Sequence, residues 1–272
     1  MLELNRIYNM DCLEGMKYID DKSIDMILCD LPYGTTKCKW DTVIPFEPLW
    51  EQYERVIKDS GAIILTASQP FTSALVMSNP KLFKYDLVWD KKNPTGHLNA
   101  KIMPLRRHES VLVFGKGKVV YNPQMRQGKK RWKGGFSETN RGCYGEHKAT
   151  RSYNDTYYPT SVIEINNANQ KAKEHPTQKP VALFEYLIKT YTNPGDLILD
   201  NCAGSGTTGV AAENLGRNSI LIEKEPKYCE IIRKRMANRQ MTLFERGEEL
   251  RMTSIEAQTE VKGYSKKNLK GE

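Results

Sequence analysis

The chain contains 272 residues with a formal net charge of +8; 39% of them are hydrophobic and 27% charged, enough for one α/β domain with an insertion or for two small domains. No stretch approaches the ~20 consecutive apolar residues of a membrane-spanning helix, and the first residues lack the basic-then-apolar order of a secretory signal. The composition therefore excludes a disordered chain and argues against a membrane protein, while six cysteines without a CxxC pair favour a reducing, cytoplasmic location.

Residues 1–115 alternate short apolar runs with amphipathic stretches, the pattern of strands connected by helices. Four apolar runs predict buried strands at Asp25–Asp30, Gly61–Ala67, Tyr85–Trp89 and Ser110–Phe114. Two further stretches predict helices at Phe46–Lys58 and at Pro70–Ser78, where Pro suits the first turn. This alternation predicts an α/β fold for the region.

The positive charge is concentrated in one segment. Residues 116–151 contain ten Lys or Arg, two acids, six Gly and four aromatic residues. This mixture can follow a phosphate backbone while offering rings to bases, although a solvated surface or a flexible loop is the alternative. Because residues 116–160 show neither a helical nor a strand period, we predict an inserted, nucleic-acid-binding region outside the core.

Regular patterns return in residues 161–245. They predict helices at Pro180–Tyr191, from about Thr207 to Leu215 and from about Pro226 to Met241, and strands at Asp196–Asp200 and Ser219–Ile222. These β-α-β units predict a doubly wound, mainly parallel α/β sheet with helices on both faces. The polar residues 246–272 predict a flexible tail.

A glycine loop follows the predicted strand that ends at Asp200. Gly204, Gly206 and Gly209 match the GxGxxG spacing of a dinucleotide site, which alone is a weak signal. A carboxylate at Asp200 would repel a pyrophosphate but would suit an ammonium group, which S-adenosylmethionine has and NAD lacks. Glu223 ends the next strand, where it can accept hydrogen bonds from ribose hydroxyls. Although either acid could be an ordinary strand-end residue, together they favour an adenosyl cofactor.

The tetrapeptide Asp30-Leu31-Pro32-Tyr33 directly follows the first predicted strand. An acid, a turn-fixing proline and an aromatic ring can bind a flat ring with an amino group, although a simple tight turn is the alternative. The Asp30 carboxylate and the Leu31 carbonyl can accept the two N–H bonds of adenine N6, which frees its lone pair, while Tyr33 stacks on the base. A base inside a duplex cannot reach such a site, so it must be flipped out.

Three motifs together resemble a known family. Asp30–Tyr33 (DLPY), His175–Pro180 (HPTQKP) and Asp200–Gly206 (DNCAGSG) resemble, in this order, the circularly permuted (β-class) amino-methyltransferases of DNA. The resemblance covers about residues 5–241 and implies a Rossmann-like methyltransferase fold, with a catalytic half at 1–115, a target-recognition region at 116–160 and a cofactor-binding half at 161–245. Two positions depart from the pattern, since Leu31 replaces the usual proline and Cys202 the usual phenylalanine.

The resemblance also implies which residues bind S-adenosyl-L-methionine. It places the methyl donor on Glu223 and on the glycine loop, including Asp200, Cys202, Ala203, Gly204 and Gly206. It places Asp11 near the adenine of the cofactor, and Thr177 and Lys179 near its methionyl end. From the residues alone, Lys179 is as well explained by a solvated surface position.

An acid at the first position of DLPY resembles the adenine-N6 type, whereas serine accompanies the cytosine-N4 type. The resemblance therefore implies an adenine-N6 methyltransferase that acts on double-stranded DNA, and it allows a homodimer. We predict that Lys129, Lys130, Arg131 and Lys133 bind phosphates, so that affinity falls steeply with salt. Replacement of Asp30 by Ala should abolish transfer and leave cofactor binding largely intact.

Other functions remain open at this point. The acceptor could be cytosine N4, RNA or a protein amide, although the basic insertion argues against the amide. The protein could also be a catalytically silent DNA-binding subunit, and a nicotinamide oxidoreductase would require NAD to bind despite Asp200. The four histidines have no metal-ligand spacing, so we expect no metal. Nothing after Met241 resembles a nuclease, so any restriction activity would come from another chain.

Overall fold

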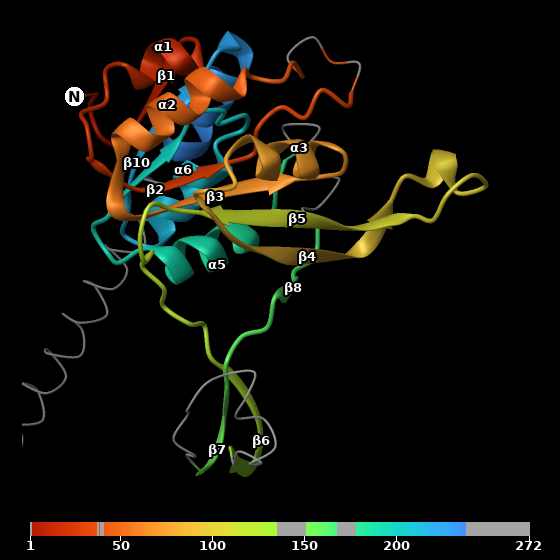
Figure 1. Ribbon diagram of the computed structural model, residues 1–272. Coiled ribbons are helices and arrows are strands. Elements are labelled where there is room, and N and C mark those ends of the chain that lie inside the picture. The colour runs from red at the N-terminus through yellow and green to blue at the C-terminus, as the bar shows by residue number, and fades with distance from the viewer. Residues whose placement is uncertain (1, 37, 39–40, 135–150, 168–177, 238–272) are drawn as a thin grey trace, which may run out of the picture.

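The computed structural model describes residues 2–36, 38, 41–134, 151–167 and 178–237 (Figure 1). Its main sheet has eight strands in the order β1-β10-β9-β2-β3-β5-β4-β8. Their bounds are β1 Arg6–Asn9, β2 Ile24–Cys29, β3 Ile57–Ala67, β4 Phe83–Thr95, β5 Arg106–Phe114, β8 Val162–Glu164, β9 Leu197–Asp200 and β10 Asn218–Glu223. Neighbouring strands are parallel except where β5 pairs with β3 and β4, which confirms the predicted mainly parallel α/β sheet.

Helices cover both faces of this sheet (Figure 1). α1 (Cys12–Met16), α2 (Phe46–Val56) and α3 (Phe71–Ser78) pack on one face, and α5 (Val181–Tyr191) and α6 (Thr207–Asn214) pack on the other. Successive side chains of β2 alternate between the two cores, Ile27 and Cys29 in one and Met26 and Leu28 in the other. The continuous apolar run of β2 is thus explained by burial on both sides.

The two halves of the chain share the sheet. β2, from the first half, pairs with β9 from the second half, and β8 pairs with β4. Strands that are far apart in sequence therefore lie side by side where β2 meets β9. The predicted tail, 246–272, lies outside the described residues.

Several predicted boundaries are wrong, because the strands expected at 61–67, 85–89 and 110–114 extend over Ile57–Ala67, Phe83–Thr95 and Arg106–Phe114. The helix expected over Phe46–Lys58 ends at Val56, and β3 begins at Ile57 without a connecting loop. Ile57 has an extended backbone, is fully buried and pairs with Ile24 of β2. Pairing with the sheet therefore outweighs the helical period that the amphipathic pattern extends to Lys58.

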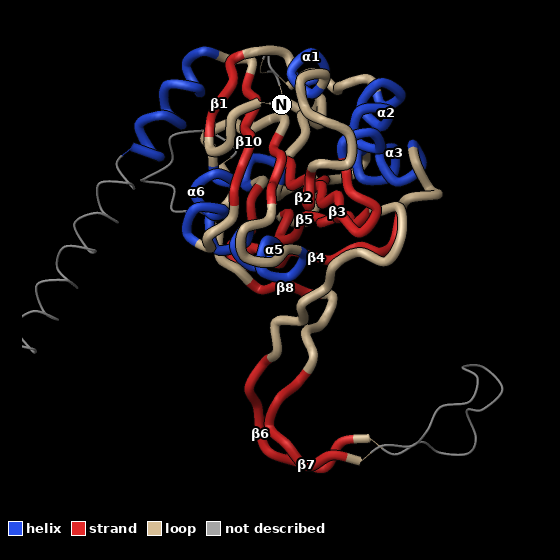
Figure 2. Tube along the Cα trace, turned by 90° about the vertical axis from the view of Figure 1, so that its left-hand side faces the viewer, coloured by secondary structure: helices blue, strands red, loops and turns tan. Residues whose placement is uncertain are grey.

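The inserted region contains regular structure that the sequence pattern did not predict. β6 (Arg126–Lys133) and β7 (Ser152–Tyr157) form an antiparallel two-stranded ribbon, which projects from the body of the molecule (Figure 2). Its pairing is supported by side chains on its surface, because the rings of Trp132 and Tyr153 lie 5.3 Å apart. Such a ribbon has no buried apolar face, so the alternation that identifies most strands is absent.

Residues 226–237 are helical and cover the glycine loop. Ile232 and Met236 of this helix pack against Leu221 of β10 and Ala203 of the loop. The loop is therefore held between the sheet edge and a helix. No helix within the described ranges combines the length and apolar character needed to cross a membrane.

Candidate active site

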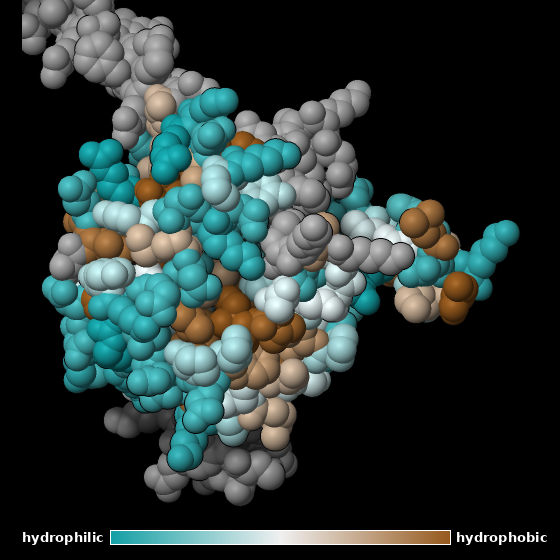
Figure 3. Space-filling model, turned by 90° about the horizontal axis from the view of Figure 1, so that it is seen from above, coloured by the Kyte–Doolittle hydropathy of each residue, from teal (hydrophilic) through white to brown (hydrophobic). Residues whose placement is uncertain are grey.

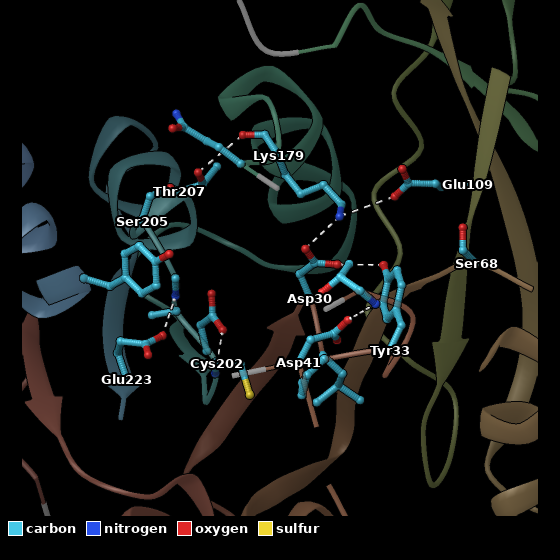
Figure 4. Close-up of a pocket in the computed structure, with 18 of the residues that line it drawn as sticks. Asp30, Tyr33, Asp41, Ser68, Glu109, Lys179, Cys202, Ser205, Thr207 and Glu223 are labelled. Carbon is cyan, nitrogen blue, oxygen red and sulfur yellow. Dashed lines mark hydrogen bonds and ion pairs between the residues drawn. The ribbon is translucent and has the colours of Figure 1, made fainter. Parts of the chain in front are cut away.

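Polar side chains gather where four parallel strands end at one edge of the sheet. Asp30 follows β2, Thr66 lies near the end of β3, Asp200 ends β9 and Glu223 ends β10. A cavity of about 480 Å³ lies at this edge (Figure 4), within the range of roughly 300–1,000 Å³ typical of ligand pockets. The fold thus brings the DLPY motif and the glycine loop into one site.

The cavity has two ends. The glycine-loop end is lined by Asp11, Cys12, Asp200–Ser205, Thr207, Glu223 and Tyr228. The Asp30 end is lined by Asp30–Tyr33, Ser68, Lys91, Thr95, Arg106, Glu109, Asn167 and Lys179. Every predicted catalytic residue lines the Asp30 end.

Glu223 is oriented by backbone donors at the glycine-loop end. Its Oε2 accepts a hydrogen bond from Gly204 N at 2.9 Å, and its Oε1 accepts one from Glu225 N at 2.9 Å. Burial raises the pKa of Glu223, and these two backbone donors oppose that shift. Each carboxylate oxygen retains a lone pair, so Glu223 can also accept hydrogen bonds from a ligand in the cavity.

Asp200 is buried among neutral donors. Thr208 Oγ1 donates to its Oδ2 at 2.5 Å, and Cys202 N donates to its Oδ1 at 3.1 Å. Burial raises the pKa of Asp200 to about 7, although both hydrogen bonds favour the charged form. A cationic group bound at this end would therefore stabilise the charged form of Asp200, which burial disfavours.

Gly206 has a structural role in this loop. Its φ of +77° is left-handed, it caps the N-terminus of α6, and an added Cβ would lie 2.9 Å from Ile232. Glycine is therefore required for the turn and for close packing of the covering helix. Gly206 was predicted to bind cofactor, but it is not among the residues that line the cavity.

Asp11 and Cys202 also line the glycine-loop end. Asp11 caps α1, since its Oδ1 accepts from Leu13 N at 2.9 Å and from Glu14 N at 3.4 Å. Cys202 Sγ accepts a weak hydrogen bond from Asn201 Nδ2 at 3.7 Å. Their contacts with a cofactor stay predictions, and the predicted Thr177 lies outside the described residues.

At the Asp30 end, hydroxyl groups orient one oxygen of the carboxylate. Tyr33 Oη donates to Asp30 Oδ1 at 2.7 Å, and Thr66 Oγ1 donates to the same atom. Burial, followed by the negative charge of Asp30, raises the pKa of Tyr33 well above its usual value, so its hydroxyl stays a neutral donor. The Tyr33 ring stacks on Phe71 at a centroid distance of 5.2 Å.

The other oxygen of Asp30 contacts Lys179. Lys179 Nζ lies 2.7 Å from Asp30 Oδ2 and 3.3 Å from Glu109 Oε2 (Figure 4). Burial alone would lower the pKa of Lys179, but the charges of Asp30 and Glu109 raise it above the usual value. Lys179 therefore stays charged beside Asp30; it is not the solvated surface residue that the sequence left open.

A second buried lysine completes this network. Lys91 Nζ lies 3.2 Å from Glu109 Oε1, and only 4% of the Lys91 side chain is exposed. Glu109 thus bridges two ammonium groups. Neither Lys91 nor Glu109 was predicted as a site residue. Each lies at the polar end of an apolar strand segment. This position alone is a weak indication of a site residue, because it is the pairing of β4 with β5 that brings the two side chains together.

A short turn follows the DLPY motif and is fixed by Asp41. The Asp41 carboxylate accepts hydrogen bonds from the backbone N–H groups of Gly34, Thr35 and Thr36 at 2.7–3.0 Å. Burial opposes ionisation of Asp41, yet these donors and the Thr36 hydroxyl lower its pKa overall. The turn therefore holds Asp30–Tyr33 against the cavity through main-chain contacts.

The predicted phosphate-binding residues lie on the ribbon, away from the cavity. Lys130 lies over the Tyr153 ring at 5.2 Å, and Arg131 lies over the Tyr157 ring at 5.0 Å. Lys129 lies on the same strand and is exposed, whereas the side chain of Lys133 is outside the described part of the structure. In the portion of the chain that is described, no cluster of three or more His, Cys, Asp or Glu side chains could hold a metal ion.

Comparisons with known proteins identify relatives of this chain. The chain is 28% identical over 255 residues to the type II methyltransferase M1.MboII of Moraxella bovis, with 84% of this chain and 95% of that protein covered. It is 29% identical over 259 residues to the type II methyltransferase M.HinfI of Haemophilus influenzae, with 86% of this chain and 68% of that protein covered.

Solved structures show the same fold. The M1.HpyAVI–SAM complex has a TM-score of 0.58 and 26% identity, covering 85% of this chain and 98% of that one. The cytosine-N4-specific PvuII DNA methyltransferase has a TM-score of 0.58 and 19% identity, covering 83% and 84%. A family model described as DNA methylase, of the N6/N4 type, matches residues 24–234. Because this match spans most of the chain, the protein belongs to the DNA methylase family.

Proposed function

We propose that this DNA methylase transfers a methyl group from S-adenosyl-L-methionine to the exocyclic N6 of an adenine flipped out of double-stranded DNA. The observation that carries the proposal is that one cavity joins a glycine loop flanked by two acids to the Asp30 end. The M1.HpyAVI structure, 26% identical, is a complex with SAM.

The groups at the glycine-loop end fit this cofactor. Asp200 is a buried carboxylate without a cationic partner among its hydrogen-bond donors, so it suits the methionyl ammonium. Glu223 is oriented to accept hydrogen bonds from ribose hydroxyls. When bound, the cofactor supplies an electrophilic methyl group on its sulfonium.

The Asp30 end fits an amino group on a planar ring. Asp30 Oδ1 is engaged by Tyr33 and Thr66, whereas Oδ2 has one named donor, Lys179, and retains a lone pair. That lone pair and the Leu31 carbonyl can accept the two N–H bonds of an exocyclic amine. In this arrangement Lys179 and Tyr33 position the carboxylate, and Asp30 holds the amine.

Adenine is the acceptor that we assign. An acid at Asp30, in DLPY, resembles the adenine-N6 type, and the resemblance is the basis for preferring N6 to cytosine N4. Base flipping follows because the reactive nitrogen of a paired base is not accessible to a cavity at a sheet edge.

We assign DNA binding to the ribbon. Lys129, Lys130 and Arg131 lie on a projecting antiparallel pair, the shape of an element that follows a nucleic-acid groove. Replacement of all three by Ala should weaken DNA binding at low salt and reduce the slope of log affinity against log salt by about 3. Titrations of labelled duplex at several salt concentrations measure both; an unchanged slope would contradict this role.

The central experiment uses the whole protein, labelled S-adenosyl-L-methionine and unmethylated duplex DNA, followed by digestion to nucleosides. Label in N6-methyladenine is the expected result. Label in N4-methylcytosine would overturn the base assignment alone. Cofactor binding without label in DNA would overturn the proposal. Label in RNA would then indicate an RNA methyltransferase, and label in neither polymer would indicate a catalytically silent subunit.

A further inference from the structure

The loop between β4 and β5, residues 96–105, ends in exposed apolar side chains. Leu98 is 100% exposed and Ile102 is 80% exposed, and Met103 beside them is also exposed. The loop projects from the sheet (Figure 1), and hydrophobic residues are visible on a projection of the space-filling model (Figure 3). Three apolar side chains at the end of a projecting loop are costly in water and call for a partner.

The segment that carries this loop tip, formed by Leu98, Ile102 and Met103, is strongly basic. Residues 91–108 contain five Lys or Arg and two His, with no Asp or Glu. Three of these cations have acidic partners nearby, since Lys91 pairs with Glu109, Lys92 lies 3.4 Å from Glu164, and Arg107 makes two 2.8 Å hydrogen bonds to Asp90. Lys101, on the loop itself, is exposed. An anionic partner therefore fits this surface better than a neutral one.

The base of the loop is part of the Asp30 end of the cavity. Thr95 pairs with Arg106 across the two strands, and both residues line the cavity. Lys91 Nζ donates to Thr95 Oγ1 at 3.2 Å and also contacts Glu109, which contacts Lys179. The loop thus rises from the same network that positions Asp30.

We propose that this loop enters DNA beside the flipped nucleotide, with Leu98 and Ile102 packed against the bases that extrusion leaves unstacked. The inference rests on the proposed function. Apolar side chains that wedge between base steps, flanked by cations on the phosphates, are a known chemistry of DNA-deforming proteins. The wedge would stabilise the extruded state and so favour entry of the adenine into the Asp30 end.

A second copy of this chain fits the tip less well. A stable interface buries roughly 800 Å² on each partner, far more than three side chains at one loop end supply. Two copies would also bring two basic segments together, whereas DNA would neutralise them.

The test compares the double variant Leu98→Ala/Ile102→Ala with a control double variant, Tyr18→Ala/Met77→Ala, which removes exposed apolar side chains elsewhere. The target site is first mapped from DNA methylated by the unchanged protein. Single-turnover methylation is then measured on the paired duplex and on a duplex with an abasic site opposite the target adenine. Fluorescence of 2-aminopurine at the target position reports extrusion.

The wedge predicts that the loop variant methylates the paired duplex about tenfold more slowly, gains less 2-aminopurine fluorescence, and recovers most of its rate opposite the abasic site. Equal rates on the paired duplex, or an equal loss on both substrates, would overturn the proposal. A changed oligomeric state of the loop variant in sedimentation would assign the tip to a second copy and also overturn it. If the unchanged protein methylates neither duplex, the proposed function fails instead.

Discussion

At the glycine-loop end of the cavity, three backbone N–H groups and the Thr208 hydroxyl, all within residues 202–225, orient the two acids, whereas at the Asp30 end side chains as far as 149 positions away in the sequence orient the carboxylate. Glu223 accepts from Gly204 N and Glu225 N, both close to the sheet edge. Asp30 is held by Thr66 of β3, by Lys179 from the second half of the chain and, through Lys179, by Glu109 of β5. The first end is built locally, and the second is assembled by the fold.

This difference predicts that substitutions at the two ends of the cavity have different effects. Loss of one group at the glycine-loop end should weaken ligand binding and leave the rest of the site in place. Loss of one charge at the Asp30 end should leave another buried charge without its partner, which affects both stability and turnover.

The largest effect is expected for Asp30→Asn. The amide keeps the shape but loses the charge that pairs with Lys179 and one acceptor for the amine, so turnover should fall by about 10³-fold. Cofactor affinity should change little, since Asp30 lies at the other end of the cavity. Single-turnover methylation and calorimetric cofactor titration measure the two quantities.

The exposed Asp86→Asn variant on β4 is the matched control. Turnover by Asp30→Asn at the rate of the unchanged protein would refute the role of Asp30. Equal loss of cofactor binding would mean that the two ends of the cavity are not separate.

The next largest effect is expected for Glu109→Gln. Lys91 and Lys179 would then lie buried around a neutral amide, and the free energy of unfolding should fall by about 3 kcal/mol. Turnover should fall as well, because Lys179 loses the second carboxylate that orients it. Denaturant unfolding and single-turnover rates give both numbers.

Adding Lys91→Met to Glu109→Gln removes the ammonium group that has lost its carboxylate, since Lys179 keeps its contact with Asp30. The double variant should regain most of the lost stability, since charge balance is restored in the buried network. If the single and double variants are equally unstable, Glu109 contributes packing and not charge.

The glycine-loop end and most of the sheet could be predicted from the sequence because each depends on neighbours in the chain. The apolar run of β2 and the acids Asp200 and Glu223 at strand ends are local patterns, and the structure confirms the strands that carry them. α2 was extended too far because the pairing of Ile57 with Ile24 is not visible in a helical period.

The Asp30–Lys179–Glu109–Lys91 network could not be predicted in the same way. Lys179 and Asp30 are 149 positions apart, and their contact depends on β2 lying beside β9 and β5 lying beside β3. The ribbon was missed for the opposite reason, since its strands lack a buried face. Neither contacts between residues far apart in the sequence nor strand pairings exposed to solvent produce a recognisable hydrophobic periodicity.

A smaller effect is expected for Glu223→Gln. The amide still accepts from one backbone N–H but loses an acceptor for the other and for the ribose, so cofactor affinity should fall about tenfold. Turnover at saturating cofactor should change little, in contrast to Asp30→Asn. Exposed Glu230→Gln is the control. A loss confined to turnover would reverse the assignment of the two ends.

The last effect is a pH dependence of cofactor affinity that originates at Asp200. Burial raises its pKa to about 7, so between pH 4 and 7 the folded protein keeps a proton that the unfolded chain releases, and this group lowers stability as pH rises through that range. An ammonium group selects the charged form, so cofactor affinity should rise about tenfold from pH 6 to pH 8 and level off above. Calorimetry in buffers of different ionisation enthalpy should detect proton release on binding near pH 6.5.

Asp200→Asn should bind cofactor weakly and without proton release, at an affinity that is independent of pH over this range. A pH dependence that survives in Asp200→Asn would place the titrating group at Glu223, whose pKa burial also raises. A flat profile in the unchanged protein would show that Asp200 does not meet the cation. The comparison of the two ends would then apply to Glu223 alone, because Asp200 would serve only to orient the loop through Thr208 and Cys202.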